Sequence, residues 1–253
     1  MKKSILILTS LLLWVCSSSA AVLLTEDFDY VAESALEGQG TPNAWKVSTK
    51  ADNAYGATPS FSVSNEGLTM PYYGEGAEAQ GLAVLVPQAT LENDSKQRVV
   101  YKTFDTNKGV NSGAVYAAFL LNVTTPSNNV RDFMSFDGST DTTLRGRLFT
   151  KKVGIGYQLG ITRANTSPVY TKTLEIGKTY LIVLKYAFID GSANDVASVY
   201  VDFPLGYKEA NVTEYATVSS DVDAGTTDPS NLKAIDLKLR DGGSLLQIAH
   251  IGS

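Results

Sequence analysis

The stretch Ala234-Ile-Asp-Leu-Lys-Leu-Arg240 alternates strictly between apolar and charged side chains. Three apolar residues fall on one face of this segment: Ile235, Leu237 and Leu239. Three charged residues fall on the other face: Asp236, Lys238 and Arg240. A two-residue period of this kind is typical of a β-strand with one face in a core and the other in solvent. We therefore expect the apolar set to be buried and the charged set to be exposed.

Strand patterns extend from this segment over the rest of the chain. Residues 196–203 alternate in the same way, whereas residues 179–186 are apolar on both faces and indicate a central strand. We expect Ile182, Leu184 and Val199 to be buried. Further strands are expected at residues 82–86, 98–104, 114–123, 132–136, 144–151, 155–162 and 245–251.

Turn signals separate these strands at short intervals. They contain the Asn, Asp and Gly residues that tight turns favour, at residues 53–56, 107–109, 137–138, 190–191 and 241–243. After residue 30 no stretch has a capped apolar repeat of helical period. The pattern predicts an all-β fold, a two-sheet antiparallel β-sandwich of the jelly-roll type with about twelve to fifteen strands. We expect one such domain over residues 21–253.

The N-terminus has the features of an export signal. Lys2 and Lys3 precede an apolar run over residues 5–15, and small residues follow up to Ala20 and Ala21. This pattern predicts a signal peptide over residues 1–20 and a secreted mature chain. Cys16 follows Val15 where a lipoprotein signal has a small residue, so acylation at Cys16 is the less favoured alternative. No stretch reaches the about 20 apolar residues that a membrane-spanning helix needs.

Composition excludes several classes of function. Cys16 is the only cysteine, so cleavage after residue 20 leaves a chain without a disulfide, a catalytic thiol or a thiolate zinc site. Removal of residues 1–20 leaves 19 basic against 26 acidic residues. By overall charge, such a chain is a poor ligand for nucleic acid and for anionic membranes. The apolar fraction of 43% is typical of a globular protein.

The sequence offers no catalytic motif, and we predict that the protein is not an enzyme. The only histidine, His250, lies three residues from the C-terminus. The Glu-x-Asp-x-x-Glu strand motif of laminarinase-like sandwich hydrolases is absent. We therefore assign no catalytic residue, no metal ligand and no cofactor. Calcium stays open, because residues 190–195 and 137–141 resemble fragments of calcium loops, although Asp-Gly is also the ordinary chemistry of hairpin turns.

Six residues are candidates for ligand binding. Four are aromatic residues in irregular segments, where sugar rings could stack on them: Trp45, Tyr55, Tyr72 and Tyr73. Arg145 and Arg147 would share one face of their strand and could grip an acidic or hydroxylated ligand. Aromatic residues in β proteins also belong to cores, and alternating charges on a strand are also simply solvated.

Several segments together resemble a family of secreted bacterial proteins, of Bacteroidetes type, with a laminin-G-like, concanavalin A-like jelly roll. These segments lie at residues 23–30, 34–40, 67–72, 144–149, 177–186, 199–202 and 234–251. The resemblance implies the sandwich fold and leaves activity open. Two departures weaken it: Trp45 comes five residues after Gly40, where relatives have a tryptophan directly, and the chain stops at residues 250–253 without a terminal arginine and tryptophan.

Three hypotheses of function follow. The first is a non-catalytic module that binds a polysaccharide or cell-surface glycan, or acts in adhesion, at the cell envelope or outside the cell. The second is a structural envelope protein without a ligand site. The third is a polysaccharide hydrolase or lyase whose site leaves no sequence signature. Neither the ligand nor the oligomeric state can be derived from the sequence.

Overall fold

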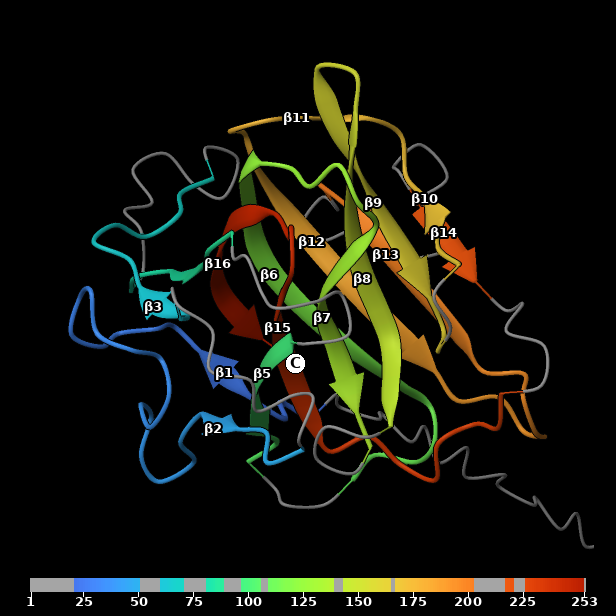
Figure 1. Cartoon of the computed structure of the whole chain (residues 1–253). Helices are drawn as coiled ribbons and strands as arrows, with labels where there is room; N and C mark the ends of the chain where they lie inside the picture. The colour runs from blue at the N-terminus through green and yellow to red at the C-terminus, as the bar shows by residue number, and fades with distance from the viewer. Residues whose placement is uncertain are drawn as a thin grey trace, which may run out of the picture.

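The computed structural model describes most of the chain in nine stretches. They are residues 21–50, 60–70, 81–88, 97–105, 109–138, 143–164, 167–202, 217–220 and 226–252. Within them lie sixteen β-strands and no α-helix. The strands form two antiparallel sheets of eight, which pack face to face (Figure 1). Residues 1–20, which carry the expected signal peptide, lie outside the described residues.

Sheet A has the strand order β14-β13-β12-β6-β16-β4-β3, with β1 paired to β16. The bounds of its strands are β1 Thr25–Glu26, β3 Ser62–Val63, β4 Val84–Val86, β6 Ala114–Thr125, β12 Thr179–Ala187, β13 Val196–Val201, β14 Thr217–Ser220 and β16 Leu245–Gly252.

Sheet B has the strand order β10-β9-β8-β7-β15-β5-β2, with β11 paired to β9. The bounds of its strands are β2 Lys46–Val47, β5 Gln97–Thr103, β7 Arg131–Asp137, β8 Leu144–Val153, β9 Gly156–Thr162, β10 Val169–Tyr170, β11 Leu174–Glu175 and β15 Ala234–Arg240.

The core lies between the sheets and follows from the alternation of the strands. Ile182 and Leu184 of β12 are buried from sheet A, and Leu237 and Leu239 of β15 are buried from sheet B. The predicted burial of Ile235 and Val199 is also confirmed. In an antiparallel pair, opposed residues share a face, so each correct register places a row of apolar side chains in the core.

The all-β sandwich is confirmed, and every strand expected from the sequence has a counterpart in the described residues. The sixteen strands exceed the expected twelve to fifteen because β1, β2, β3, β10 and β11 have only two residues each. Pairs this short have no readable period in the sequence. Among the described residues no helix is long and apolar enough to cross a membrane.

The predicted exposure of the charged residues of β15 is wrong. Asp236 and Lys238 are buried at 0% and 1% exposure, and Arg240 is half-buried. They do lie on the face opposite Leu237, as the alternation predicts. That face is nevertheless closed: Lys238 Nζ lies 2.9 Å from Asp132 Oδ2, and Arg240 Nε lies 3.7 Å from Asp132 Oδ1.

Candidate functional site

A polar pocket opens at one end of the sandwich, where β6 and β13 begin and β12 ends. Its volume is about 220 Å³. Residues from three separate segments line it: Asn111, Ser112, Gly113, Phe188, Ile189, Asp190, Gly191, Asp195, Asp228 and Pro229. The register explains the meeting of the first two segments, because Ala187 of β12 lies opposite both Ala114 of β6 and Val196 of β13.

Asp195 holds the loop between β12 and β13 in place. Its side chain is 1% exposed, and its two oxygens accept hydrogen bonds from the Tyr186 hydroxyl at 3.0 Å and the Ile189 backbone amide at 2.8 Å. Burial raises the pKa of the Asp195 carboxyl, and the nearby Asp228 carboxylate adds to this effect. Burial likewise raises the pKa of Tyr186. Asp195 therefore forms a buried part of the pocket lining, and Tyr186 supports it from the core.

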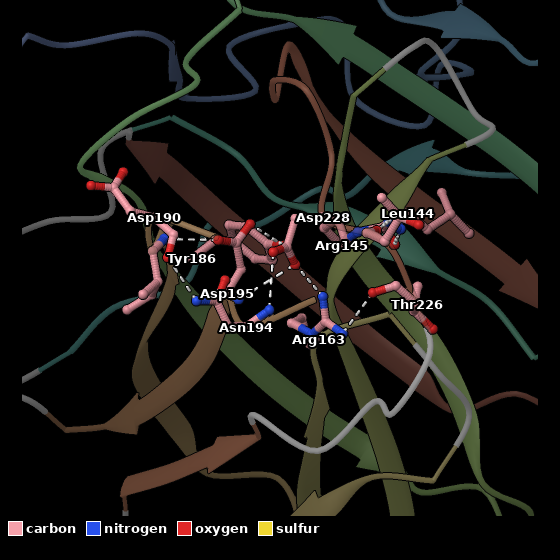
Figure 2. Close-up of polar contacts among 11 residues, drawn as sticks. Leu144, Arg145, Arg163, Tyr186, Asp190, Asn194, Asp195, Thr226 and Asp228 are labelled. Atoms are coloured by element: carbon pink, nitrogen blue, oxygen red, sulfur yellow. Dashed lines mark hydrogen bonds and ion pairs between the residues drawn. The ribbon is translucent and has the colours of Figure 1, made fainter. Parts of the chain in front are cut away.

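Asp228, in the segment before β15, is hydrogen-bonded to the same loop. It accepts a hydrogen bond from the Asn194 backbone amide at 3.0 Å, and its other oxygen pairs with the fully buried guanidinium of Arg163. Arg163 also donates to the Thr226 carbonyl at 3.0 Å. Figure 2 shows Arg163 between Asp228 and Thr226, so one buried cation joins β9 to the segment before β15.

A second group of side chains faces outward. Asn111, Ser112 and Asp190 are exposed, and the Asp190 carboxylate points away from the Asp195–Asp228 cluster (Figure 2). Phe188 is half-buried, with its ring edge-on to Tyr186 at a centroid distance of 5.4 Å. The pocket thus combines an amide, a hydroxyl and a carboxylate with an aromatic ring, and these groups can hydrogen-bond and stack on a small polyhydroxylated ligand.

The charge of the pocket favours some ligands over others. Asp190, Asp195 and Asp228 supply three carboxyl groups; Arg163 pairs with Asp228, and its charge also acts on Asp195. An anionic ligand is therefore disfavoured. In the described part of the chain no group of three or more Asp, Glu, His or Cys residues is arranged to hold a metal ion. Residues 139–142, part of the second calcium-like fragment, lie outside the described residues.

Trp45 lies in the core and not at the surface. It is 1% exposed, its ring stacks on Phe28 at a centroid distance of 6.0 Å, and its Nε1 donates to Glu26 Oε2 at 2.9 Å. Lys102 Nζ reaches the same oxygen at 2.5 Å, and the Tyr30 hydroxyl at 2.8 Å. The structure therefore corrects the expectation of a surface stacking platform: Trp45 joins the N-terminal segment to β5.

Arg145 and Arg147 do not share a face. Between them the β7–β8 register shifts: Met134 lies opposite Leu148, but Phe136 lies opposite Arg145, which leaves one extra residue on β8. Gly146 takes up this bulge with a φ of 55°. Arg145 donates to the Leu144 and Thr227 carbonyls on the Tyr186 side (Figure 2).

Arg147 points to the opposite face of sheet B. Its Nη2 lies 2.8 Å from Asp132 Oδ2, and its guanidinium lies 5.1 Å from the Phe149 ring centroid. At 9% exposure each, neither arginine forms part of the pocket lining.

Tyr55, Tyr72 and Tyr73 lie outside the described residues. The pocket residues Asn111, Ser112 and Phe188 were not predicted from the sequence. The turn at residues 190–195 was singled out, but as a calcium-loop fragment. The sequence at residues 107–109 predicts only a turn, and no sequence pattern predicts that residues 111 and 190 lie close together.

No protein-family model matches the chain, and no curated protein matches it. Among solved structures, an engineered GH43 glycoside hydrolase with endo-xylanase and exo-arabinofuranosidase activity aligns over 93% of this chain and 41% of its own, at 10% identity and a TM-score of 0.51. The chain therefore spans less than half of that enzyme. The globular domain of T. cruzi calreticulin aligns over 92% of this chain and 87% of its own, at 12% identity and a TM-score of 0.48.

Peanut lectin, in complex with a 9mer peptide, aligns over 92% of this chain and 98% of its own, at 11% identity and a TM-score of 0.44. At such identities only the fold is shared. Together with the two eight-stranded sheets, the comparison shows that the chain has the concanavalin A-like lectin and glucanase jelly roll. The concanavalin A-like part of the expected resemblance is confirmed. The laminin-G-like relationship and the bacterial origin stay predictions.

Proposed function

We propose that this protein is an exported, non-catalytic module that binds carbohydrate in the pocket at the end of the sandwich. One observation carries the proposal: an aromatic ring, an amide, a hydroxyl and a carboxylate line the same pocket of about 220 Å³. Pockets for drug-sized ligands span about 300–1,000 Å³, so this pocket suits a single sugar ring. Its acidic lining favours a neutral or amino sugar over a uronic acid.

The buried carboxylates support a binding role over catalysis. Asp195 accepts two hydrogen bonds, from Tyr186 and Ile189, and Asp228 accepts from Arg163 and Asn194. A general acid or base needs a carboxyl oxygen within hydrogen-bond reach of the substrate. Here these oxygens hold the loop that presents Phe188 and Asp190. Their role is therefore to keep the binding groups in place.

The fold agrees with the proposal without deciding it. The similar structures include peanut lectin and glycoside hydrolases of families 16 and 43, so the same sandwich supports sugar-related functions in other proteins. The pattern of residues 1–20 supports export through the general secretory route. Mass spectrometry of the mature N-terminus tests this part: a chain that starts near residue 21 supports it, whereas an intact Met1 contradicts it.

A glycan array with the purified chain, followed by calorimetric titration of the best ligand, tests the binding site. We expect Asp190→Asn to weaken binding about tenfold, because a hydrogen bond to a charged group contributes about 1.5–3 kcal/mol. Phe188→Ala should weaken it by a similar factor through the loss of stacking. The matched control is Asp29→Asn, since Asp29 is exposed and does not line the pocket.

Three results would count against the proposal. A blank array would favour the structural-protein hypothesis. Binding that Asp190→Asn and Phe188→Ala leave unchanged would place the site elsewhere. Release of reducing ends or unsaturated products from a bound polysaccharide, lost in Asp195→Asn, would favour the hydrolase or lyase hypothesis.

A further inference from the structure

The β8–β9 hairpin ends in an exposed aliphatic tip. Val153 lies opposite Gly156, so the turn contains only Gly154 and Ile155. Gly154 has a φ of 56° at the first turn position, which is the arrangement of a type II′ turn. Ile155 at the second position is 99% exposed. Figure 1 shows this hairpin extending beyond the two sheets.

This exposure is unusual for the position. Two-residue hairpin turns normally carry Asn, Asp, Ser or Gly after the first glycine, because these side chains are solvated at no cost. Ile155 has the highest exposure of the large apolar side chains among the described residues. Ile176 is 37% exposed in the segment that follows β11, and β11 pairs with the tip end of the hairpin, where Glu175 lies opposite Gly156. The two isoleucines therefore lie at the same end of the molecule.

Lysines surround this tip. Lys151 and Lys152 lie near the end of β8, just before Val153, and Lys172 and Lys178 flank β11. Lys152, Lys172 and Lys178 are exposed, and Lys151 Nζ lies 5.6 Å from the Tyr170 ring centroid.

Two carboxylates oppose these four lysines among the described residues. Glu175 Oε1 lies 3.5 Å from Lys178 Nζ, and Asp202 is half-buried and accepts from the Leu181 amide. The tip is therefore cationic in a chain with a net charge of −5.

We propose that this tip docks the protein on an anionic lipid surface, with Ile155 inserted at the acyl boundary and the lysines at the headgroup phosphates. Charge complementarity selects an anionic surface, and each lysine near such a surface contributes favourably. The isolated aliphatic side chain selects lipid, because an acidic polysaccharide offers no apolar interior in which Ile155 would be buried. The acidic remainder of the molecule is repelled by the same surface, so the tip alone faces it.

Co-sedimentation with vesicles tests the proposal on the whole mature chain. The probes are vesicles of phosphatidylcholine alone and of phosphatidylcholine mixed with phosphatidylglycerol. We expect binding to the mixed vesicles that falls with salt, and at least about tenfold weaker binding to phosphatidylcholine alone. Ile155→Asn should weaken binding to the mixed vesicles about tenfold or more. Asn suits this turn position, so the hairpin is retained.

Two further variants complete the design. The double variant Lys152→Gln/Lys172→Gln should weaken binding by about fivefold per lysine. Val31→Asn is the matched control, because Val31 is 75% exposed and lies outside the hairpin. It should bind as the unaltered chain does, and equal thermal unfolding midpoints would show that all variants are folded.

Other outcomes overturn the proposal. These are the absence of vesicle binding, equal binding to both vesicle types, and binding that Ile155→Asn does not change. Binding to soluble alginate that depends on the lysines but not on Ile155, with no vesicle binding, would assign the tip to an acidic polysaccharide instead.

Discussion

The Asp132 carboxylate is in contact with three cationic side chains. Lys238 and Arg147 share its Oδ2 at 2.9 and 2.8 Å, and Arg240 lies 3.7 Å from its Oδ1. Burial alone would raise the pKa of Asp132, but attraction to Lys238, Arg147 and Arg240 outweighs it and holds the pKa well below the ordinary range. Burial in turn lowers the pKa of Lys238. Lys238 and Arg240, on the charged face of β15, thus both contact Asp132.

Removal of that anion should destabilise the fold. Asp132→Asn leaves the buried Lys238 and Arg147 without their carboxylate, and loss of one partner of a buried pair costs about 3–5 kcal/mol in the free energy of unfolding. Urea unfolding measures this loss. The exposed control Asp29→Asn should stay within about 0.5 kcal/mol of the unaltered chain. Adding Lys238→Met to Asp132→Asn should recover part of the loss; a purely additive double variant would contradict the direct pairing.

The Asp132 carboxylate should also determine how steeply the free energy of unfolding falls at acidic pH. Its folded pKa is lowered, so its contribution is complete above the unfolded value of about 3.9 and is lost as the pH falls toward the folded pKa. Below about pH 4 the free energy of unfolding should therefore drop more steeply in the unaltered chain than in Asp132→Asn. Urea titrations at several pH values measure the two slopes.

Asp195 should change the free energy of unfolding with pH in the opposite direction to Asp132. Its pKa is raised by burial, so its contribution is present below the unfolded value and is lost as the pH rises through the folded pKa. Equal acid slopes for the unaltered chain and Asp132→Asn would show that folding does not lower the pKa of Asp132.

At the scale of the elements, the bulge at Gly146 determines which face of sheet B each arginine side chain of β8 points to. It turns Arg145 toward Tyr186 and Arg147 toward Asp132. A glycine inside a strand signals a bulge or a close approach, but it does not say which way the following side chain turns. The sequence could therefore predict the strand and not the facing of its two arginines.

Gly146→Ala should destabilise the protein by about 1–3 kcal/mol, because alanine is strained at a φ of 55°. Its Cβ would also lie 3.3 Å from the Phe136 ring. Gly38→Ala is the matched control: Gly38 has a φ of 86° but open space around its Cβ position. Urea unfolding should show the larger loss for Gly146→Ala, and equal losses would mean that the contact with Phe136 contributes nothing.

The alternation of β15 shows both the reach and the limit of pattern reasoning. A two-residue period identifies which residues share a face, and Leu237 and Lys238 do lie on opposite faces. It does not say whether the second face is open to solvent. Asp132 lies more than a hundred residues before Lys238, and their 2.9 Å contact depends on the β7–β15 register. The strand itself is therefore predicted correctly from the sequence, but the exposure of its charged side chains is not.

At the scale of the whole molecule, turn spacing and the absence of helical periodicity were enough to predict the jelly roll. The candidate site was not predictable in this way. Its lining comes from residues 111–113, 188–195 and 228–229, which meet only when β6, β12 and β13 are aligned. The turn at residues 190–191 was visible in the sequence, but its partners on the other segments were not. The expected aromatic Trp45 belongs to the core for the ordinary reason that large apolar rings are buried.

The pairing of β1 with β16 determines how the molecule would respond to a mechanical load on its two ends. Thr25 lies opposite Gly252 and Glu26 opposite Ile251, so the chain enters and leaves at the same end of one short antiparallel ladder. A force that separates the ends loads this ladder one hydrogen-bonded pair at a time, as in a zipper, instead of shearing all pairs together. Glu26, in the second pair of this ladder, adds resistance because its carboxylate is bound to Trp45 and Lys102. Mechanical separation of β1 from β16 would therefore be opposed at its second pair by a single buried carboxylate.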